Sequence, residues 1–114
     1  MIIELYRTAN NRQQTMASFD SPATILVTGG TGLLGNAVKE IVGQTSTNAS
    51  WVFVGSQDAD LTCLQSTTAL FEKVKPTHVL HLAAKVGGLY ANSDDNVGFW
   101  RQNMLMQVCA SRNC

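Results

Sequence analysis

The 114-residue sequence has no long apolar run, little charge and few cysteines, and each scarcity excludes a class of function. No apolar stretch approaches the roughly 20 residues that a membrane-spanning helix needs. Lysine and arginine together number 8, as do aspartate and glutamate, so the formal net charge is zero. Such a chain has no electrostatic attraction to nucleic acid or to an anionic membrane. The length allows one small domain.

The three cysteines, Cys63, Cys109 and Cys114, form no C-x-x-C pair and follow no secretory signal peptide. Reduced thiols in a cytoplasmic protein are therefore expected. His78 and His81 stand three residues apart on an expected strand, so their side chains point to opposite faces. We therefore expect no metal site at these histidines.

A glycine-rich turn between a strand pattern and a helix pattern is the most informative segment of the chain. The β-branched run at residues 24–27 before it is typical of a strand buried on both faces. After the turn, apolar residues recur at helical spacing, which predicts a helix that packs on a sheet, and Gly43 is expected to cap its end. Strand, turn and helix in this order predict the start of a dinucleotide-binding βαβ unit. The apolar helix positions are Leu34, Ala37, Val38, Ile41 and Val42.

The turn and the start of this helix are predicted to bind the pyrophosphate of a dinucleotide. A helix N-terminus offers unpaired N–H groups and a partial positive charge, which hold an anion if no side chain intervenes. At Gly35 a side chain would also push the helix away from the strand. The alternative is a structural turn whose glycines serve only tight packing. The predicted cofactor-binding residues here are Gly29, Gly30, Thr31, Gly32, Leu33, Leu34 and Gly35.

A second strand pattern at residues 51–54 ends in Gly55-Ser56-Gln57. In an NAD site, an acidic residue near this strand end binds the ribose 2′-hydroxyl. The first acidic residue here is Asp58. A missing carboxylate removes repulsion towards a 2′-phosphate, so NADP is the expected cofactor and Ser56 an expected contact. The alternative is that Asp58 swings back towards the ribose.

The sequence then predicts a helix that Pro76 ends, and Thr62 and Gln65 fit a capping box at its start. Asp60 has two interpretations, which the sequence leaves open. It is either a loop residue near the helix start or, together with Leu61, a contact to the adenine of the cofactor. The buried face of the helix is marked by Leu64, Phe71 and Val74.

A third strand pattern covers residues 78–83 and ends in two small residues, Ala83 and Ala84. Ligands of open α/β sheets bind at the carboxyl ends of strands, and small residues there let a nicotinamide ribose approach the backbone. Ala83 and Ala84 are therefore predicted cofactor contacts. A glycine-containing loop at residues 85–89 follows, and then a helix from 96 to about 109.

These elements predict an α/β fold, a Rossmann-like doubly wound parallel sheet that is truncated after its first half. Residues 1–22 are expected to form a flexible N-terminal extension, and residues 23–114 the N-terminal part of an NAD(P)-binding domain. Without further strands, the third strand keeps one open edge, so weak stability and poor residual NADP affinity are expected.

From about Thr24 to Met106 the motifs resemble the extended short-chain dehydrogenase/reductase family. The resemblance implies an NADPH-dependent enzyme that epimerises and then reduces a GDP-linked 4-keto-6-deoxy sugar, and it implies a homodimer. It also implies a tyrosine, activated by a lysine four residues on, that protonates the alkoxide. The matching segments are residues 25–35, 51–54, 58–62, 69–74, 76–84, 86–89 and 99–104.

The catalytic residues implied by the resemblance are not among these 114 residues. Tyr6 and Tyr90 are the only tyrosines, and Asn10 and Asp94 stand four residues on where lysine is required. Cys109 does not match the family's epimerising cysteine. We therefore expect a chain that is catalytically incomplete by itself. The alternatives are a non-enzymatic NADP-binding module, and a fragment that pairs with full-length subunits and interferes with them.

Overall fold

The computed structural model describes residues 4–7 and 22–114, and a four-stranded sheet in the order β1-β4-β2-β3 organises them. β2 (Thr24–Thr28) pairs in parallel with β3 (Ser50–Val54) on one side and with β4 (His78–His81) on the other. Parallel neighbours of this kind need long crossover connections, and helices supply them here. The predicted α/β, Rossmann-like fold is confirmed.

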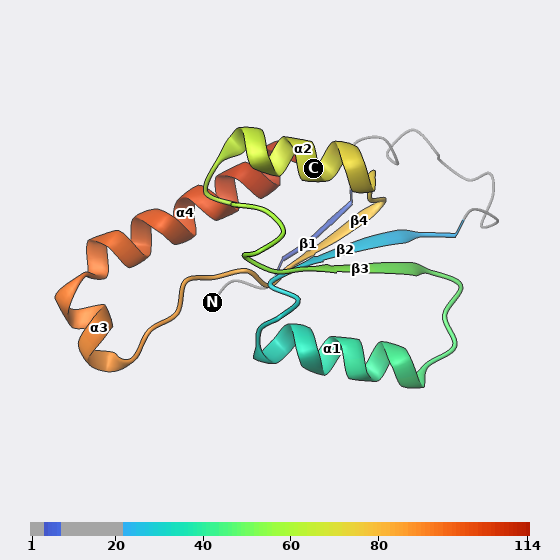
Figure 1. The fold of residues 1–114 in the computed structure, drawn as a ribbon, viewed down its shortest axis with the longest axis horizontal. Helices are drawn as coiled ribbons and strands as arrows, with labels where there is room; N and C mark the ends of the chain where they lie inside the picture. Colours follow the sequence, from blue (N-terminus) through green and yellow to red (C-terminus); the bar gives the residue numbers. More distant parts are fainter. Residues whose placement is uncertain (1–3, 8–21) are drawn as a thin grey trace.

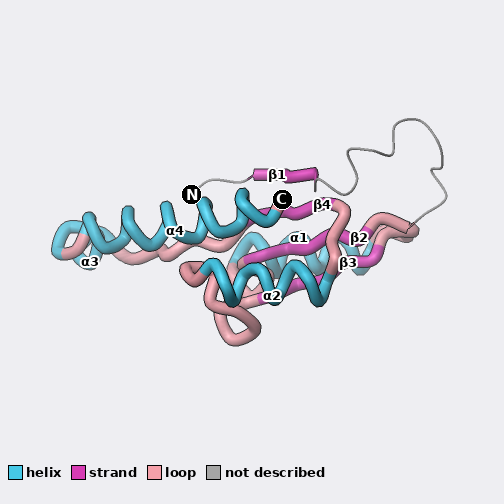
Figure 2. Tube along the Cα trace, turned by 90° about the horizontal axis from the view of Figure 1, so that it is seen from above, coloured by secondary structure: helices cyan, strands magenta, loops and turns pink. Residues whose placement is uncertain are grey.

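Helices cover both faces of the sheet, as in doubly wound folds. α1 (Leu33–Gln44) lies on one face, and α2 (Leu64–Val74) and α4 (Asn96–Asn113) lie on the other (Figure 1). α3 (Leu89–Asp94) lies beyond the sheet, at the far end of α4 (Figure 2). None of the helices described is long and apolar enough to cross a bilayer.

The core is centred on β2 because this strand has a neighbour on each side and helices on both faces. Leu26 and Val27 are completely buried, as the uninterrupted apolar run predicted, and so is Val79 of β4. Met106 and Cys114 pack against the core from the C-terminal part of the chain. The main cluster, which includes side chains of α2, consists of Leu26, Val54, Leu61, Leu70, Phe71 and Val79.

α1 buries a narrower stripe than its apolar pattern predicted. The partly buried side chains stand at i, i+4 and i+8, the row that runs almost straight along a helix. Ile41, predicted to lie on the buried face, is 63% exposed, because it lies to one side of that row. The partly buried residues of the row are Leu34, Val38 and Val42.

Gly43 is not the left-handed cap that the sequence predicted. It lies inside α1, which continues to Gln44. Thr45 closes the helix instead: its N–H donates to the Val42 carbonyl at 3.2 Å and its hydroxyl donates to the Ile41 carbonyl at 3.0 Å. Because the threonine satisfies the terminal carbonyls, no positive φ is needed at the glycine.

The predicted capping box at the start of α2 is also wrong. The N-cap residue is Cys63, and it makes no side-chain cap hydrogen bond. The N–H and the hydroxyl of Thr62 both donate to Oδ1 of Asp60, at 2.9 and 2.6 Å. The threonine therefore makes its hydrogen bonds to Asp60, two residues earlier in the chain, rather than to the helix.

The end of α2 and part of its buried face follow the prediction. The helix ends at Val74, and Lys75 takes the left-handed conformation, with φ of 49°, just before Pro76. Phe71 is buried, whereas Leu64 is 40% exposed, contrary to the prediction. Leu64 is the first helical residue, so its side chain lies at the rim of the α2 contact with the sheet.

Residues Glu4–Arg7 form β1, which pairs antiparallel with β4. The sequence predicted a flexible extension here and an open outer edge at the third strand. Pairing an edge requires only backbone N–H and C=O groups, so four residues of extended chain are sufficient. The rest of the predicted extension, apart from Pro22, lies outside the described residues.

Candidate functional site

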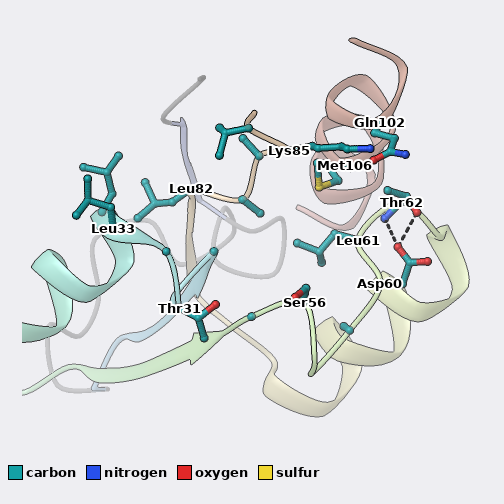
Figure 3. A pocket seen from close by; sticks show the side chains of 18 residues that line it. Thr31, Leu33, Ser56, Asp60, Leu61, Thr62, Leu82, Lys85, Gln102 and Met106 are labelled. Carbon is teal, nitrogen blue, oxygen red and sulfur yellow. Dashed lines mark hydrogen bonds between the residues drawn. The ribbon is translucent and has the colours of Figure 1, made fainter. Parts of the chain in front are cut away.

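A cavity of about 580 Å³ is lined by the segments that follow the carboxyl ends of β2, β3 and β4, together with α4 (Figure 3). β2 is the strand from which the chain crosses to neighbours on both sides, and ligands of doubly wound folds bind at such a point. The lining residues are Gly29, Thr31, Gly32, Leu33, Leu34, Gly55, Ser56, Ala59, Asp60, Leu61, Thr62, Leu82, Ala83, Ala84, Lys85, Val86, Gln102 and Met106.

The glycine turn is built so tightly that two of its positions exclude any side chain. Gly29 has φ of +73°, and a Cβ atom there would lie 2.7 Å from the backbone nitrogen of Ala83. A Cβ atom at Gly30 would lie 2.8 Å from the Cβ atom of Phe53, and its N–H donates to the Val54 carbonyl at 2.8 Å. The turn therefore rests directly on the two neighbouring strands.

The N-terminus of α1 opens into this cavity without a competing acceptor. Gly32 is the N-cap residue and makes no side-chain cap hydrogen bond, and the first turn contains no acidic residue. The N–H groups of Leu33 and Leu34 have no intrahelical acceptor because they belong to the first turn. Both residues line the cavity. The positive end of the helix dipole is thus available to an anion.

Most of the sequence-predicted site residues come together around the cavity, whereas Gly30 and Gly35 do not line it. Gly35 is buried, and a Cβ atom there would lie 2.5 Å from the Cα atom of Gly30. The tight-packing alternative therefore describes these two glycines. The predicted residues that do line the cavity are Gly29, Thr31, Gly32, Leu33, Leu34, Ser56, Asp60, Leu61, Ala83 and Ala84.

The end of β3 presents small neutral residues to the cavity. Gly55 and Ser56 line it, and the side chain of Thr31 packs on Gly55, where an added Cβ atom would lie 2.7 Å from the threonine Oγ1. Asp58 is directed to its own loop, where its Oδ2 accepts the Gly55 N–H at 2.7 Å. This hydrogen bond holds the Asp58 carboxylate in the turn. The carboxylate therefore does not swing towards the position of a ribose in this structure.

Asp60 organises the start of α2 and also lines the cavity, so both of its interpretations stay open. Its carboxylate accepts the N–H and the hydroxyl of Thr62, and these hydrogen bonds lower the pKa of Asp60 below its ordinary value. Its own N–H donates to Oγ of Ser66 at 3.1 Å. The carboxylate is fully exposed and therefore also accessible to a ligand.

The wall that follows β4 is held by α4. The Lys85 N–H donates to Oδ1 of Asn103 at 2.7 Å, and Nδ2 of Asn103 donates to the Lys85 carbonyl at 3.0 Å. Nζ of Lys85 lies 4.9 Å from the centre of the Phe99 ring, and the same ring packs on Gly87. An otherwise irregular loop is thereby fixed against a helix.

Sequence reasoning missed the part of the lining that comes from α4 and from the segment after β4, and three residues between β3 and α2. Gln102 and Met106 stand four residues apart and so share one face of α4, a spacing that was present in the sequence. What the sequence did not provide was the position of that face over the sheet. The missed lining residues are Gly55, Ala59, Thr62, Leu82, Lys85, Val86, Gln102 and Met106.

Comparison with known families assigns the chain on most of its length. Residues 25–110 match the NAD dependent epimerase/dehydratase family. The chain belongs to this family. The match begins at β2 and ends within α4. It therefore includes every residue that lines the cavity.

Two of the similar proteins have names that refer to the same enzyme. The chain is 53% identical over 83 residues to a Drosophila melanogaster protein named "Probable GDP-L-fucose synthase". It is 49% identical over 90 residues to the GDP-L-fucose synthase of Dictyostelium discoideum. These matches cover 72% and 78% of this chain but only 26% and 28% of those proteins. The chain thus spans about a quarter of the length of the curated relatives it matches.

A solved structure extends the comparison to the fold. A crystal structure of a GDP-L-fucose synthetase from Naegleria fowleri bound to NADP superposes with a TM-score of 0.74 at 40% identity. The match covers 97% of this chain and 33% of that chain. The described fold is therefore similar to one third of a protein that holds NADP.

Proposed function

We propose that this chain binds NADP(H) in the cavity and supplies the dinucleotide-binding part of a GDP-L-fucose synthase, which epimerises and reduces GDP-4-keto-6-deoxy-mannose. The observation that carries the proposal is the glycine turn, whose uncapped α1 N-terminus opens into the cavity beside β2. The similarity to synthases, among them an NADP-bound structure, supports the same function.

The residues around the cavity fit a dinucleotide. The N–H groups at Leu33 and Leu34 would hold the pyrophosphate, because the glycine backbone leaves them uncovered, whereas the Gly32 N–H donates to the Gly29 carbonyl at 3.0 Å. Asp60 and Leu61 would contact the adenine end. On the opposite wall, Ala83 and Ala84 would lie against the nicotinamide ribose. When bound, NADPH supplies the hydride that reduces the ketone, and the protein orients it.

We propose NADP rather than NAD as the cofactor because of the end of β3. Gly55 and Ser56 line the cavity there, while the Asp58 carboxylate accepts a hydrogen bond from its own turn. A 2′-phosphate placed beside these residues meets no facing carboxylate from that turn. Titration with NADPH and NADH under the same conditions is expected to give tighter binding of NADPH.

The acid–base step of the synthase is assigned to no described residue. The sequence contains no tyrosine followed by lysine at the fourth position. We therefore propose that the 114 residues bind the cofactor without turning over the GDP-sugar. Assaying NADPH oxidation in the presence of the keto-sugar checks this, and steady turnover by the isolated chain would contradict it.

Substitution at Gly32 tests the cofactor site most sharply. Aspartate is a favourable N-cap residue, and Gly32 has an extended backbone, with φ of −78° and ψ of 177°, that aspartate adopts readily. A Cβ atom at Gly32 would lie 3.3 Å from the Gly29 carbonyl oxygen, a tight contact, so Gly32→Asp is expected to change stability little once the turn shifts slightly. Its carboxylate faces the position proposed for the pyrophosphate. NADPH affinity should fall at least about tenfold.

Gly32→Asn is the matched control, because it has nearly the same size and capping ability without the charge. It is expected to weaken NADPH binding less than Gly32→Asp does, in fluorescence titrations extended to high NADPH concentration. Equal affinities of the wild-type chain and Gly32→Asp would rule out a pyrophosphate at this helix end.

We further propose that α4 pairs with a second copy of the chain, as the family resemblance implies. Apolar side chains at helical spacing remain exposed on its outer face, and Trp100 is 66% exposed. Sedimentation equilibrium measures the association. The exposed α4 residues of this face are Val97, Trp100, Met104 and Val108.

The proposed location is the cytosol, where the free cysteines stay reduced.

A further inference from the structure

A buried polar pair joins the ends of the two strands that flank the cavity. Thr28 is the last residue of β2, His81 is the last residue of β4, and the two are register partners in the parallel ladder. Their exposed fractions are 0% and 1%. Oγ1 of Thr28 lies 2.7 Å from Nδ1 of His81, which is a short hydrogen bond.

The pair stands where the two walls of the cavity separate. Gly29 follows Thr28 and begins the glycine turn, whereas Leu82 follows His81 and begins the opposite wall. The last backbone connection between them is the Leu82 N–H, which donates to the Thr28 carbonyl at 3.1 Å. After this point the β4 side has no regular secondary structure until α3 begins.

The two walls are in direct contact at this point. Gly29 packs so closely on the opposite wall that a Cβ atom would lie 2.7 Å from the nitrogen of Ala83 and 2.8 Å from the carbonyl carbon of Leu82. A small relative shift of the ends of β2 and β4 therefore displaces the glycine turn. The amides at the start of α1 would move with it.

We infer that Thr28 and His81 are positioning residues that fix the separation of the two cavity walls and thereby the affinity for the dinucleotide. The inference rests on the proposed function, because it assigns a role towards the same ligand. A hydrogen bond suits this task better than apolar contact, since it has a preferred distance and direction. Neither residue lines the cavity, so both act through Gly29 and Ala83.

Removal of the hydroxyl tests the pair. Thr28→Val keeps the shape of the side chain but leaves Nδ1 of His81 without the threonine oxygen, whereas Thr28→Ser keeps that oxygen. Thr28→Val is expected to weaken NADPH binding about tenfold, and Thr28→Ser to stay near the wild-type affinity. The matched control is Thr67→Val, because Thr67 is also completely buried and donates its hydroxyl to the Cys63 carbonyl within α2.

A second pair of variants keeps the test decisive if Thr28→Val does not fold. The side-chain amide of asparagine occupies the position of Nδ1, whereas that of glutamine occupies the position of Nε2. His81→Asn therefore retains a partner for Thr28 and His81→Gln does not. NADPH affinity is expected to be higher in His81→Asn than in His81→Gln. Thermal unfolding of both variants shows whether a difference in stability accounts for the difference in affinity.

Hydrogen exchange provides a readout that does not depend on the ligand. With the hydroxyl removed, amides of residues 29–34 and 82–86 are expected to exchange faster, while those of α2 are unchanged. Thr67→Val should show the reverse pattern. If wild-type chain fails to bind NADPH while the two walls still loosen in Thr28→Val, the proposed function is wrong and the positioning of the walls stands.

Two results would overturn the inference. One is equal loss of NADPH affinity in Thr28→Val and Thr67→Val at equal loss of stability, which would reduce the pair to core packing. The other is unchanged exchange of both walls in Thr28→Val together with equal affinities of His81→Asn and His81→Gln.

Discussion

At the scale of single residues, Gly29 and Gly43 have opposite requirements. Gly29 combines a positive φ with backbone contact to Ala83, so both its conformation and its surroundings exclude a side chain. Gly43 lies in helical conformation inside α1, with no atom within 4 Å of an added Cβ. The sequence alone presents both as glycines near a helix end, and only the structure separates them.

Alanine at these two positions is expected to change stability in opposite directions. Gly29→Ala should lower the free energy of unfolding by at least about 2 kcal/mol, because the strain at positive φ adds to the clash with Ala83. Gly43→Ala should raise it by up to about 1 kcal/mol, because alanine restricts the unfolded chain and favours the helix. Urea denaturation of the two variants measures both effects, and destabilisation by Gly43→Ala would contradict the assignment of residue 43 to α1.

The cysteines give a pH dependence whose sign follows from burial. Desolvation raises the pKa of Cys114 to about 11, from an ordinary value of 9.0, and it also raises the pKa of Cys109. Cys63 is exposed. Iodoacetamide is therefore expected to modify Cys63 first near pH 8, while the rate at Cys114 continues to rise from pH 9 towards 11.

The free energy of unfolding also depends on the ionisation of Cys114. Because the folded chain keeps the Cys114 proton to higher pH than the unfolded chain, its contribution is fully present below pH 9 and is lost as pH rises towards about 11. Peptide mapping by mass spectrometry separates the three thiols, and equal modification rates of Cys63 and Cys114 at pH 8 would contradict the burial.

At the scale of elements, the periodic segments could be predicted and the choices between competing partners could not. β2, β3 and α2 follow from local apolar patterns, which reflect burial directly. The hydroxyl of Thr62 had a choice between accepting an N–H of α2 and donating to Asp60, and its hydrogen bond to Asp60 is decided by the path of the loop. Gln102 lines the cavity because α4 lies across the sheet, and no local pattern carries that information.

The Asn103 side chain connects α4 to the loop that follows β4, and its removal has a clear expected effect. Asn103→Ala removes both of its hydrogen bonds to Lys85, so the wall that follows β4 should exchange its amides faster, and NADPH binding should weaken several-fold. Asn113→Ala is the control, because Asn113 donates to the Cys109 carbonyl within the same helix. If both variants leave the exchange of residues 82–88 unchanged, the two hydrogen bonds do not hold the loop.

At the scale of the whole molecule, β1 changes what is expected of the sheet. The sequence predicted an open edge at β4, with weak stability as one of its consequences. That edge is covered by Glu4–Arg7, which leaves the outermost exposed strand short. Short edge strands are one of the ways in which natural sheets avoid pairing with other chains.

Deletion of residues 1–7 is therefore expected to lower the midpoint of thermal unfolding and to increase self-association. The physical reason is that β4 then presents unpaired N–H and C=O groups to solvent and to other chains. Light scattering and circular dichroism on the same samples follow both quantities. Deletion of residues 1–3 alone leaves β1 in place and is the control; identical behaviour of the two deletions would remove β1 from this role.

The antiparallel pairing of β1 also determines when the molecule is completed. Of the four described strands the ribosome makes β1 first, yet its partner β4 emerges only after β2, α1, β3 and α2 have been synthesised. The loop that closes this pair is the longest between any two neighbouring strands, so its entropic cost is the largest. Of the four described strands, the one that is synthesised first is thus expected to be the last to pair.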